Sequence, residues 1–352
     1  MKKIISIIYV IFLALMLISC AAPDQEPEQT QVAIITPSPS PSASPTSSPT
    51  PIPTTTANNV PKSCTTGLPF DGEYKPVLVS IENSPAARPQ LGLQTADVVY
   101  EIPVEGSITR FLCLFSDNVP EEVLPVRSAR VPFLYVIKEW DCIFMHYGGS
   151  GSENKHGTEP YNFYGHRLYD HISIDVDGHT GHWSNYYHRV DNASAPHNVM
   201  ANPALAQQLY DYDPKPHAWN FSEKTPYLGE PTQEINLSMC SNISNLVSYT
   251  YDEQSQLYMR SMQGKPFIAK ETDTQLTVKN IVIQYCKHKV SSKIRLWELT
   301  GEGKADFYIS GVHIEGSWKR DSAEDQTQYL DTEGNEIIFM PGNTWIHIHP
   351  ND

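Results

Sequence analysis

The chain has 352 residues, of which 40% are hydrophobic, so it is long enough and apolar enough to form two ordinary domains with buried cores. Its formal net charge of -15 at pH 7 argues against nucleic acid, or an anionic membrane surface, as a general partner. Local basic sites remain compatible with that overall charge.

The first twenty residues carry the strongest signal in the sequence. Lys2 and Lys3 precede a short apolar run, which is typical of a secretory signal rather than of a mature membrane span. The run ends in LISC, which resembles a bacterial lipobox, and that resemblance implies cleavage before Cys20 and attachment of lipid to its sulfur. We therefore expect a signal peptide over residues 1–20 and a lipid-anchored globule on the extracytoplasmic side of the cell membrane. An uncleaved anchor helix is the alternative.

Residues 21–63 are rich in Pro, Ser and Thr and lack apolar periodicity, with seven prolines between positions 37 and 53. Such a composition cannot bury a core and favours extended, polyproline-like conformations. At roughly 3.1 Å per residue, the proline-rich part alone could reach about 50 Å. The segment therefore predicts a disordered tether that holds a globule away from a membrane.

The folded part is predicted to be α+β, with an N-terminal mixed α/β sheet domain over residues 64–228 and a smaller, mostly-β C-terminal domain over residues 229–352. In the first domain KPVLVSIEN, ADVVYEIPV, ITRFLCLF and DCIFMHYGG are predicted strands, and SARVPFLYVIKEW is a predicted helix. Asn202 and Pro203 are typical of a second helix start. In the second domain, short strand patterns alternate with turn signals.

The stretch EIPVEGSITRF predicts a β-hairpin that carries charges. The Gly-Ser pair at 106–107 suits a two-residue turn, which would pair Pro103 with Arg110. In that register Glu101, Glu105 and Arg110 share one face, opposite an apolar face for the core. We expect either a structural ion network or the polar floor of a ligand site. The two glutamates would lie about 13 Å apart, too far for a glycosidase pair.

Further candidates come from the motifs PVRSAR, HYGGS and APHN. Arg127 and Arg130 lie near a predicted helix start, and guanidinium groups suit carboxylate or phosphate ligands; pairing with the hairpin glutamates is the equally weighted alternative. His146 ends a predicted strand, and His197 and Asn198 precede a predicted helix. We expect Arg127, Arg130, His146 and His197 to line a cleft for an anionic ligand, with Asn198 as a further ligand-binding candidate. As catalytic residues, His146 and His197 are weak candidates.

A histidine-rich segment raises the question of a metal. Eight of the thirteen histidines fall between positions 146 and 197, where Asp175, Asp177 and His179 also lie close together. Imidazole and carboxylate groups can hold transition metals, but no HExxH motif or EF-hand pattern occurs. We predict no metal and no cofactor.

Several motifs, in the same order, resemble the YerB-like family of bacterial lipoproteins. They are SIENSPAARPQLGLQTADVVYEIPVEGSITRFLCLF, PVRSAR, HYGGS and APHN in the first domain, and GKADFYISGVHIEGSWKRD and MPGNTWIHI in the second. The resemblance covers most of the chain after residue 70. It implies two domains and attachment to a surface, but no established chemistry.

Two classes of function therefore stay open. The first is a non-catalytic lipoprotein that binds an anionic cell-envelope component or a partner protein. The second is an extracytoplasmic hydrolase or transferase that acts on an anionic envelope glycan or peptide. The lack of a strong nucleophile or metal motif in the sequence favours binding.

Overall fold

The computed structural model describes residues 60–151, 159–240 and 246–351. The predicted signal peptide, Cys20 and nearly all of the predicted tether lie outside these residues. Asn58–Asp352 form one compact unit, called the folded unit below. None of the described helices is both long enough and apolar enough to span a membrane.

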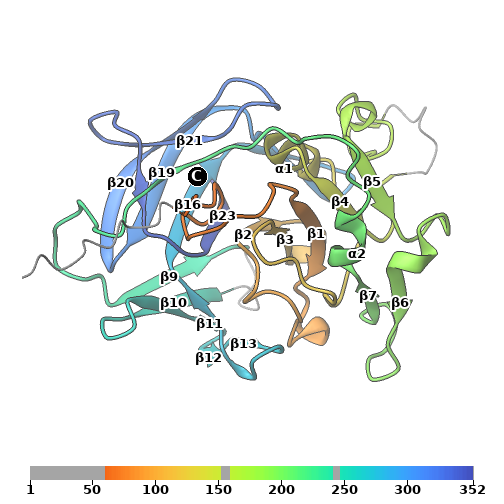
Figure 1. Cartoon of the computed structure of the whole chain (residues 1–352), viewed down its shortest axis with the longest axis horizontal. Helices are drawn as coiled ribbons and strands as arrows, with labels where there is room; N and C mark the ends of the chain where they lie inside the picture. The colour runs from red at the N-terminus through yellow and green to blue at the C-terminus, as the bar shows by residue number, and fades with distance from the viewer. Residues whose placement is uncertain (1–59, 152–158, 241–245, 352) are drawn as a thin grey trace, which may run out of the picture. The chain divides into compact units, whose positions relative to one another are not determined.

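The folded unit is built around one mixed ten-stranded sheet, in the order β21-β20-β19-β16-β23-β2-β3-β1-β4-β5 (Figure 1). Its strands are β1 (Val77–Glu82), β2 (Val98–Pro103), β3 (Thr109–Phe115), β4 (Ile143–His146), β5 (Ile174–Asp177), β16 (Asn280–Cys286), β19 (Gly301–Ile309), β20 (Val312–Arg320), β21 (Gln328–Asp331) and β23 (Thr344–Pro350). Five strands come from each predicted region, and the halves meet where β2 and β23 pair in parallel, with Glu101 opposite His347. The predicted α+β class is confirmed.

Both faces of this sheet are covered, which explains why its central strands are almost continuously apolar. Every residue of β2 and β3 is buried. On one face, α1 (Phe133–Trp140) shares a core with Tyr100 and Leu112. On the other face, a five-stranded sheet shares a core with Val99 and Phe111. That second sheet consists of β9 (Glu234–Ser238), β10 (Leu246–Asp252), β11 (Leu257–Met262), β12 (Lys265–Pro266) and β15 (Thr277–Val278).

Short elements complete the described fold. They are α2 (Pro203–Gln207) and the strand pairs β6 (Tyr187–Arg189) with β7 (Val199–Ala201), β8 (Asn220–Phe221) with β22 (Ile338–Phe339), β13 (Ile268–Ala269) with β14 (Thr274–Gln275), and β17 (His288–Ser291) with β18 (Ile294–Trp297). The predicted start of α2 is confirmed, because the Asn202 side chain accepts a hydrogen bond from the backbone N–H of Leu205 at 2.7 Å. Ser63, which the sequence placed in the tether, is buried and donates to Asp117.

The predicted register of the β2–β3 hairpin is wrong by one residue. Arg110 lies opposite Ile102 rather than Pro103. The Gly-Ser turn at 106–107 is present, with both residues at positive φ. However, the N–H of Val104 donates to the carbonyl of Ile108, whose own N–H donates to the carbonyl of Glu105. Two residues therefore face one across the hairpin, and this bulge turns Arg110 to the face opposite Glu101.

Two buried ion pairs join the halves of the chain, one on each face of the shared sheet. On the face of the five-stranded sheet, Arg260 Nη2 lies 2.8 Å from Glu101 Oε2, and both side chains are fully buried. On the α1 face, Arg320 Nη1 lies 3.1 Å from Glu139 Oε2, and both side chains are about 1% exposed. Each pair takes its carboxylate from the N-terminal half and its guanidinium from the C-terminal half.

Hydrogen bonds satisfy the rest of the Glu101 carboxylate. Thr109 Oγ1 donates to it at 2.7 Å, and His347 Nδ1 lies 3.2 Å away. Burial alone would raise the pKa of Glu101, but Arg260 and His347 outweigh it and lower the pKa to about 2. The Arg260 guanidinium also lies 4.6 Å from the centre of the Trp345 ring, which adds a cation–π contact.

Replacing Arg260 with leucine should lower the free energy of unfolding by about 3–5 kcal/mol, because Glu101 would stay buried without its counter-charge. Urea unfolding of the folded unit measures this. Adding Glu101→Gln to Arg260→Leu should recover part of the loss, since a neutral amide is less costly to bury. Lys265→Leu, at an exposed cation on β12, is the control and should change stability by less than about 0.5 kcal/mol. A loss below about 1 kcal/mol for Arg260→Leu would contradict the role given to this pair.

Candidate functional site

Three arginines, two glutamates and one histidine gather where β1 ends and β3 begins, beside the loop that precedes α1. This arginine cluster consists of Arg110, Arg127, Arg130, Glu82, Glu105 and His197. Glu82 and Arg110 face each other across β1 and β3, while the loop carrying Arg127 and Arg130 is held to β1 by the bond from the Arg127 N–H to the Ser80 carbonyl. The cluster therefore has a rigid base, with three guanidinium groups against two carboxylates.

Arg110 is the buried member of the cluster, with 1% of its surface exposed. Its Nη1 donates to the carbonyl of Ser128 at 2.5 Å, while its Nε has no hydrogen-bond partner among the described residues. No carboxylate of the described chain lies within ion-pair distance of it. Burial, and next the nearby Arg130, lower the pKa of Arg110 to about 9, which still leaves it charged at neutral pH.

Glu82 is a second member of the cluster, and its carboxylate contacts two partly exposed side chains, Arg127 and His197. Glu82 Oε2 lies 3.0 Å from Arg127 Nε and 2.8 Å from His197 Nδ1. The Arg127 and His197 side chains are 29% and 21% exposed, whereas that of Glu82 is 4% exposed. Glu82 therefore fixes both groups at the surface.

The third arginine forms a forked pair. Arg130 donates from Nε to Glu105 Oε2 at 2.7 Å, and its Nη2 bonds Oε1 of the same carboxylate. Burial alone would raise the pKa of Glu105, but Arg130 lowers it to about 2. The expected Glu–Arg–Glu network around Arg110 is therefore wrong, because Glu105 pairs with Arg130 and Glu101 pairs with Arg260.

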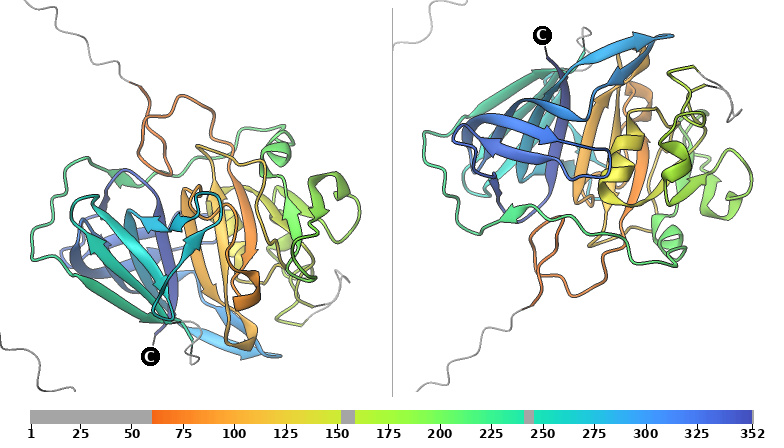
Figure 2. Two further views of the ribbon diagram at one scale, coloured as in Figure 1. Left: turned by 90° about the horizontal axis from the view of Figure 1, so that it is seen from below. Right: turned by 90° about the horizontal axis from the view of Figure 1, so that it is seen from above.

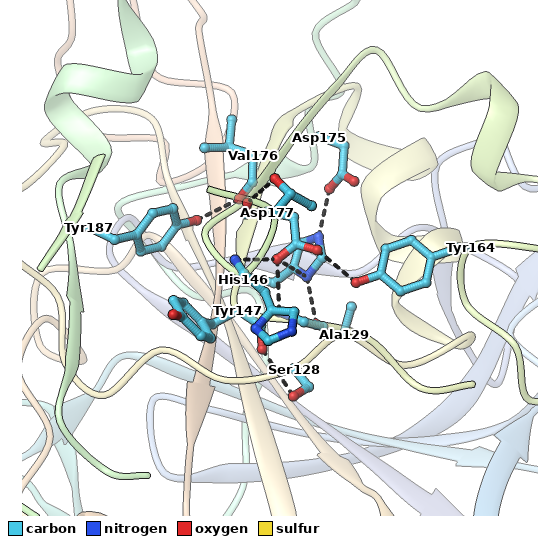
Figure 3. A network of polar contacts seen from close by, with 12 residues as sticks. Ser128, Ala129, His146, Tyr147, Tyr164, Asp175, Val176, Asp177 and Tyr187 are labelled. Atoms are coloured by element: carbon cyan, nitrogen blue, oxygen red, sulfur yellow. Dashed lines mark hydrogen bonds and ion pairs between the residues drawn. The ribbon is translucent and has the colours of Figure 1, made fainter. Parts of the chain in front are cut away.

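His146 is the centre of a second polar network, behind the loop that carries Ser128 (Figure 3). The imidazole is fully buried, with Nε2 2.7 Å from Asp175 Oδ1 and Nδ1 2.7 Å from the carbonyl of Gly148. Asp177 accepts hydrogen bonds from Tyr164 and from the N–H of Gly148. Both aspartates lie on β5, which pairs in parallel with β4, so β-sheet pairing brings them to His146.

The partners of His146 require protons on both ring nitrogens, since a carbonyl and a carboxylate can only accept. Burial alone would lower the pKa of His146, but Asp175, and next Asp177, outweigh it and raise the pKa above its ordinary value of 6.5. A buried imidazolium with two occupied donors is not available as a general base. The network instead fixes the loop at 127–130, because the N–H of Ala129 and the hydroxyl of Ser128 donate to the carbonyls of Gly148 and Tyr147.

Family models match both halves of the chain. Residues 65–215 match the N-terminal domain, and residues 235–346 the C-terminal domain, of a protein of unknown function, DUF3048. The chain belongs to the DUF3048 family. It is 31% identical over 290 residues to a Bacillus subtilis (strain 168) protein named "Putative lipoprotein YerB", covering 79% of this chain and 82% of that protein.

The fold of this chain is also similar to a solved structure of the same relative. The crystal structure of YerB protein from Bacillus subtilis matches with a TM-score of 0.69 and 30% identity, covering 82% of this chain and 97% of that one. The predicted resemblance to the YerB-like family is therefore confirmed.

Within this DUF3048 protein, the residues selected from sequence fall into four places. Arg110, Arg127, Arg130, Glu105 and His197 form the cluster. Glu101 lies in the buried network that it forms with Arg260 and His347, called the interior network below. His146 is fully buried in a network of its own. Asn198 accepts a hydrogen bond at 2.6 Å from Arg189, the last residue of β6. The four-residue cleft expected around Arg127, Arg130, His146 and His197 thus lacks His146.

Two residues of these polar networks were missed or misplaced by sequence reasoning. Glu82, which holds Arg127 and His197, was not selected, although a glutamate that ends a strand of buried residues could have drawn attention to it. Asp175 was considered only as a metal ligand in a loop, and it lies on β5. Among the described residues, no three His, Cys, Asp or Glu side chains are grouped to hold a metal ion.

His146 should be doubly protonated at pH 7, and long-range ¹⁵N–¹H NMR spectra of the folded unit would show this. Because its folded pKa is raised, its stabilisation is fully present below about pH 6.5, its pKa when unfolded, and is lost as pH rises through the folded pKa. His146→Gln should therefore cost more stability at pH 6 than at pH 9. A neutral His146 tautomer at pH 6 would contradict the assignment.

Proposed function

We propose that this protein is a membrane-anchored extracytoplasmic lipoprotein that binds an anionic component of the cell envelope at the arginine cluster. The observation that carries the proposal is Arg110, a buried guanidinium without a carboxylate at ion-pair distance among the described residues. Buried charges in proteins are normally paired, and leaving one unpaired is costly. An anionic ligand would supply the missing counter-charge.

The arrangement of the other members supports an anion that reaches Arg110 from the surface. Arg127 and His197 are partly exposed and fixed by one carboxylate, so they are ordered before a ligand binds. Arg130 is already engaged in a fork with Glu105. A phosphate or carboxylate group can accept several N–H donors at once, which matches the free Nε of Arg110 and the exposed side of Arg127.

Anchoring rests on different observations. The motif LISC follows a basic start and an apolar run, and the relative of 31% identity is named a lipoprotein. A lipid on Cys20, followed by a proline-rich tether of about forty residues, would place the folded unit outside the membrane but within reach of the envelope.

A second candidate function, a hydrolase or transferase, is favoured by one contact. Glu82 holds Nδ1 of His197 at 2.8 Å, and a carboxylate in this position orients an imidazole so that Nε2 can exchange protons. His146 cannot take this role because both of its ring nitrogens are bonded inside the protein. Ser128 is a poor nucleophile, since its hydroxyl donates to the carbonyl of Tyr147.

Replacing Cys20 with alanine should abolish lipid attachment, because the sulfur is the predicted acceptor. Metabolic labelling with a radioactive fatty acid in a bacterial host, followed by immunoprecipitation, measures this. A Cys64→Ala variant is the control and should incorporate label like the parent. Equal labelling of the Cys20→Ala variant would end the claim of lipidation at this residue.

Inorganic phosphate and glycerol phosphate should bind the folded unit, and Arg127→Ala should weaken binding by about tenfold, roughly the loss of one charge-assisted contact. Isothermal titration calorimetry measures both affinities. Affinity should also fall as salt rises from low ionic strength to 0.15 M, where the screening length is about 8 Å.

Arg189→Ala is the matched control, because Arg189 is exposed and pairs with Asn198 outside the cluster. Equal phosphate affinities for Arg127→Ala and Arg189→Ala would contradict the proposed site. Turnover of a phosphate ester or an envelope glycan that disappears in His197→Gln, but not in Arg189→Ala, would establish the second candidate function instead.

A further inference from the structure

The hairpin formed by β17 and β18 carries an unusual charge for this acidic chain. Residues 287–298, called the basic hairpin, contain Lys287, Lys289, Lys293 and Arg295, and Glu298 is their one acidic residue. The three lysines are exposed, and only Lys289 has an ion-pair partner among the described residues, Glu298 at 3.8 Å. The chain as a whole has a net charge of -15, so this is a local concentration of positive charge.

The basic hairpin is held rigidly beside the arginine cluster. Trp297 Nε1 donates to the carbonyl of Pro103 at 2.8 Å, and Arg295 Nη1 donates to the carbonyl of Val104 at 2.9 Å. The next residue, Glu105, is the partner of Arg130. The basic hairpin therefore places positive charge next to the turn that carries Glu105, at the edge of the cluster, although Lys289 lies on the hairpin face opposite Arg295.

The basic hairpin lies far from the residues at which the described chain begins. Both views in Figure 2 show the hairpin, in light blue, at the opposite end of the folded unit from the orange segment where the described chain begins. Since the predicted tether joins the chain at that beginning, the hairpin faces the side of the folded unit that is far from the attachment point.

We infer that the basic hairpin and the arginine cluster together bind an extended, phosphate-bearing polymer rather than a single small anion. The inference rests on the proposed function and deepens it by naming the ligand class, a flexible chain of phosphodiesters. One phosphate group occupies the cluster next to Arg110, and neighbouring phosphates contact Lys287, Lys289 and Lys293. Exposed lysines suit such a ligand because each lysine contacts a phosphate as a point charge and needs no fixed orientation.

The test compares poly(glycerol phosphate) with monomeric glycerol phosphate by calorimetry on the folded unit. The variant carries Lys287→Gln, Lys289→Gln and Lys293→Gln. The matched control carries Lys224→Gln, Lys265→Gln and Lys270→Gln, three exposed lysines elsewhere whose loss changes the net charge equally. The hairpin variant should bind the polymer about tenfold or more weakly, about 1.4 kcal/mol, and should keep the affinity for the monomer, whereas the control should match the parent.

The outcomes separate this inference from the proposed function. Equal polymer affinity for the hairpin variant and the control, with monomer binding that still depends on Arg127, overturns the polymer and leaves the anion site standing. Polymer binding that depends on the hairpin, without any monomer binding, supports the basic hairpin and overturns the small-anion site. Binding to phosphatidylglycerol vesicles that requires the hairpin lysines, without polymer binding, identifies a membrane surface as the ligand and overturns the inference.

Discussion

The fold depends on two charge pairs buried on opposite faces of one sheet. Glu101 with Arg260, and Glu139 with Arg320, each join the N-terminal half of the chain to the C-terminal half. Such pairs add little net stability compared with apolar residues of similar size, but losing one partner is costly, so they strongly favour one way of assembling the two halves. They explain how a chain with two family regions forms a single ten-stranded sheet rather than two independent domains.

Side chains along a β-strand point alternately to the two faces of the sheet, and this alternation separates the buried Glu101 pair from the arginine cluster. Thr109 and Arg110 are neighbours on β3, and their side chains point to opposite faces of the sheet. Thr109 enters the interior network, where every charge has a partner, and Arg110 enters the cluster, where cations outnumber carboxylates. The one-residue bulge before the turn determines this division. The proposed binding surface and the structural network thus share adjacent residues, and their different charge balance distinguishes them.

The position of the basic hairpin depends on the same segment of backbone as the arginine cluster. It is attached to the bulged turn through the carbonyls of Pro103 and Val104, so the position of its lysines depends on the same local backbone that orients Arg110. The His146 network plays a comparable part on the other side, since it fixes the loop that carries Arg127 and Arg130. Both networks hold cations in fixed positions, and in the proposed function this order reduces the entropy lost when an anion binds.

Much of the fold could be predicted from sequence, because long apolar runs and cap residues are local signals. The strands at Val77–Glu82 and Thr109–Phe115 and the helix start at Asn202 are examples. The hairpin register could not be predicted, because a bulge has no clear signature and, with both faces buried, apolar alternation does not fix the register.

The ion-pair partners could not be predicted either. Arg260 lies 159 residues from Glu101, and Arg320 lies 181 residues from Glu139. Arg130 with Glu105 was foreseen as one alternative because both motifs already stood out. The aspartates of β5 were misread because a strand at the edge of the sheet, with polar residues, resembles a loop.

The proposed function requires that an anion bind to the buried guanidinium of Arg110. The most direct measurement is the ¹⁵N–¹H resonance of Arg110 Nε, assigned by comparison with an Arg110→Lys variant and followed during titration of the folded unit with inorganic phosphate. We expect a saturable shift of this resonance as phosphate binds, because a phosphate oxygen then accepts a hydrogen bond from the unpartnered Nε–H of Arg110. A resonance that stays unchanged while phosphate binds elsewhere, or no saturable binding at all, would contradict the account.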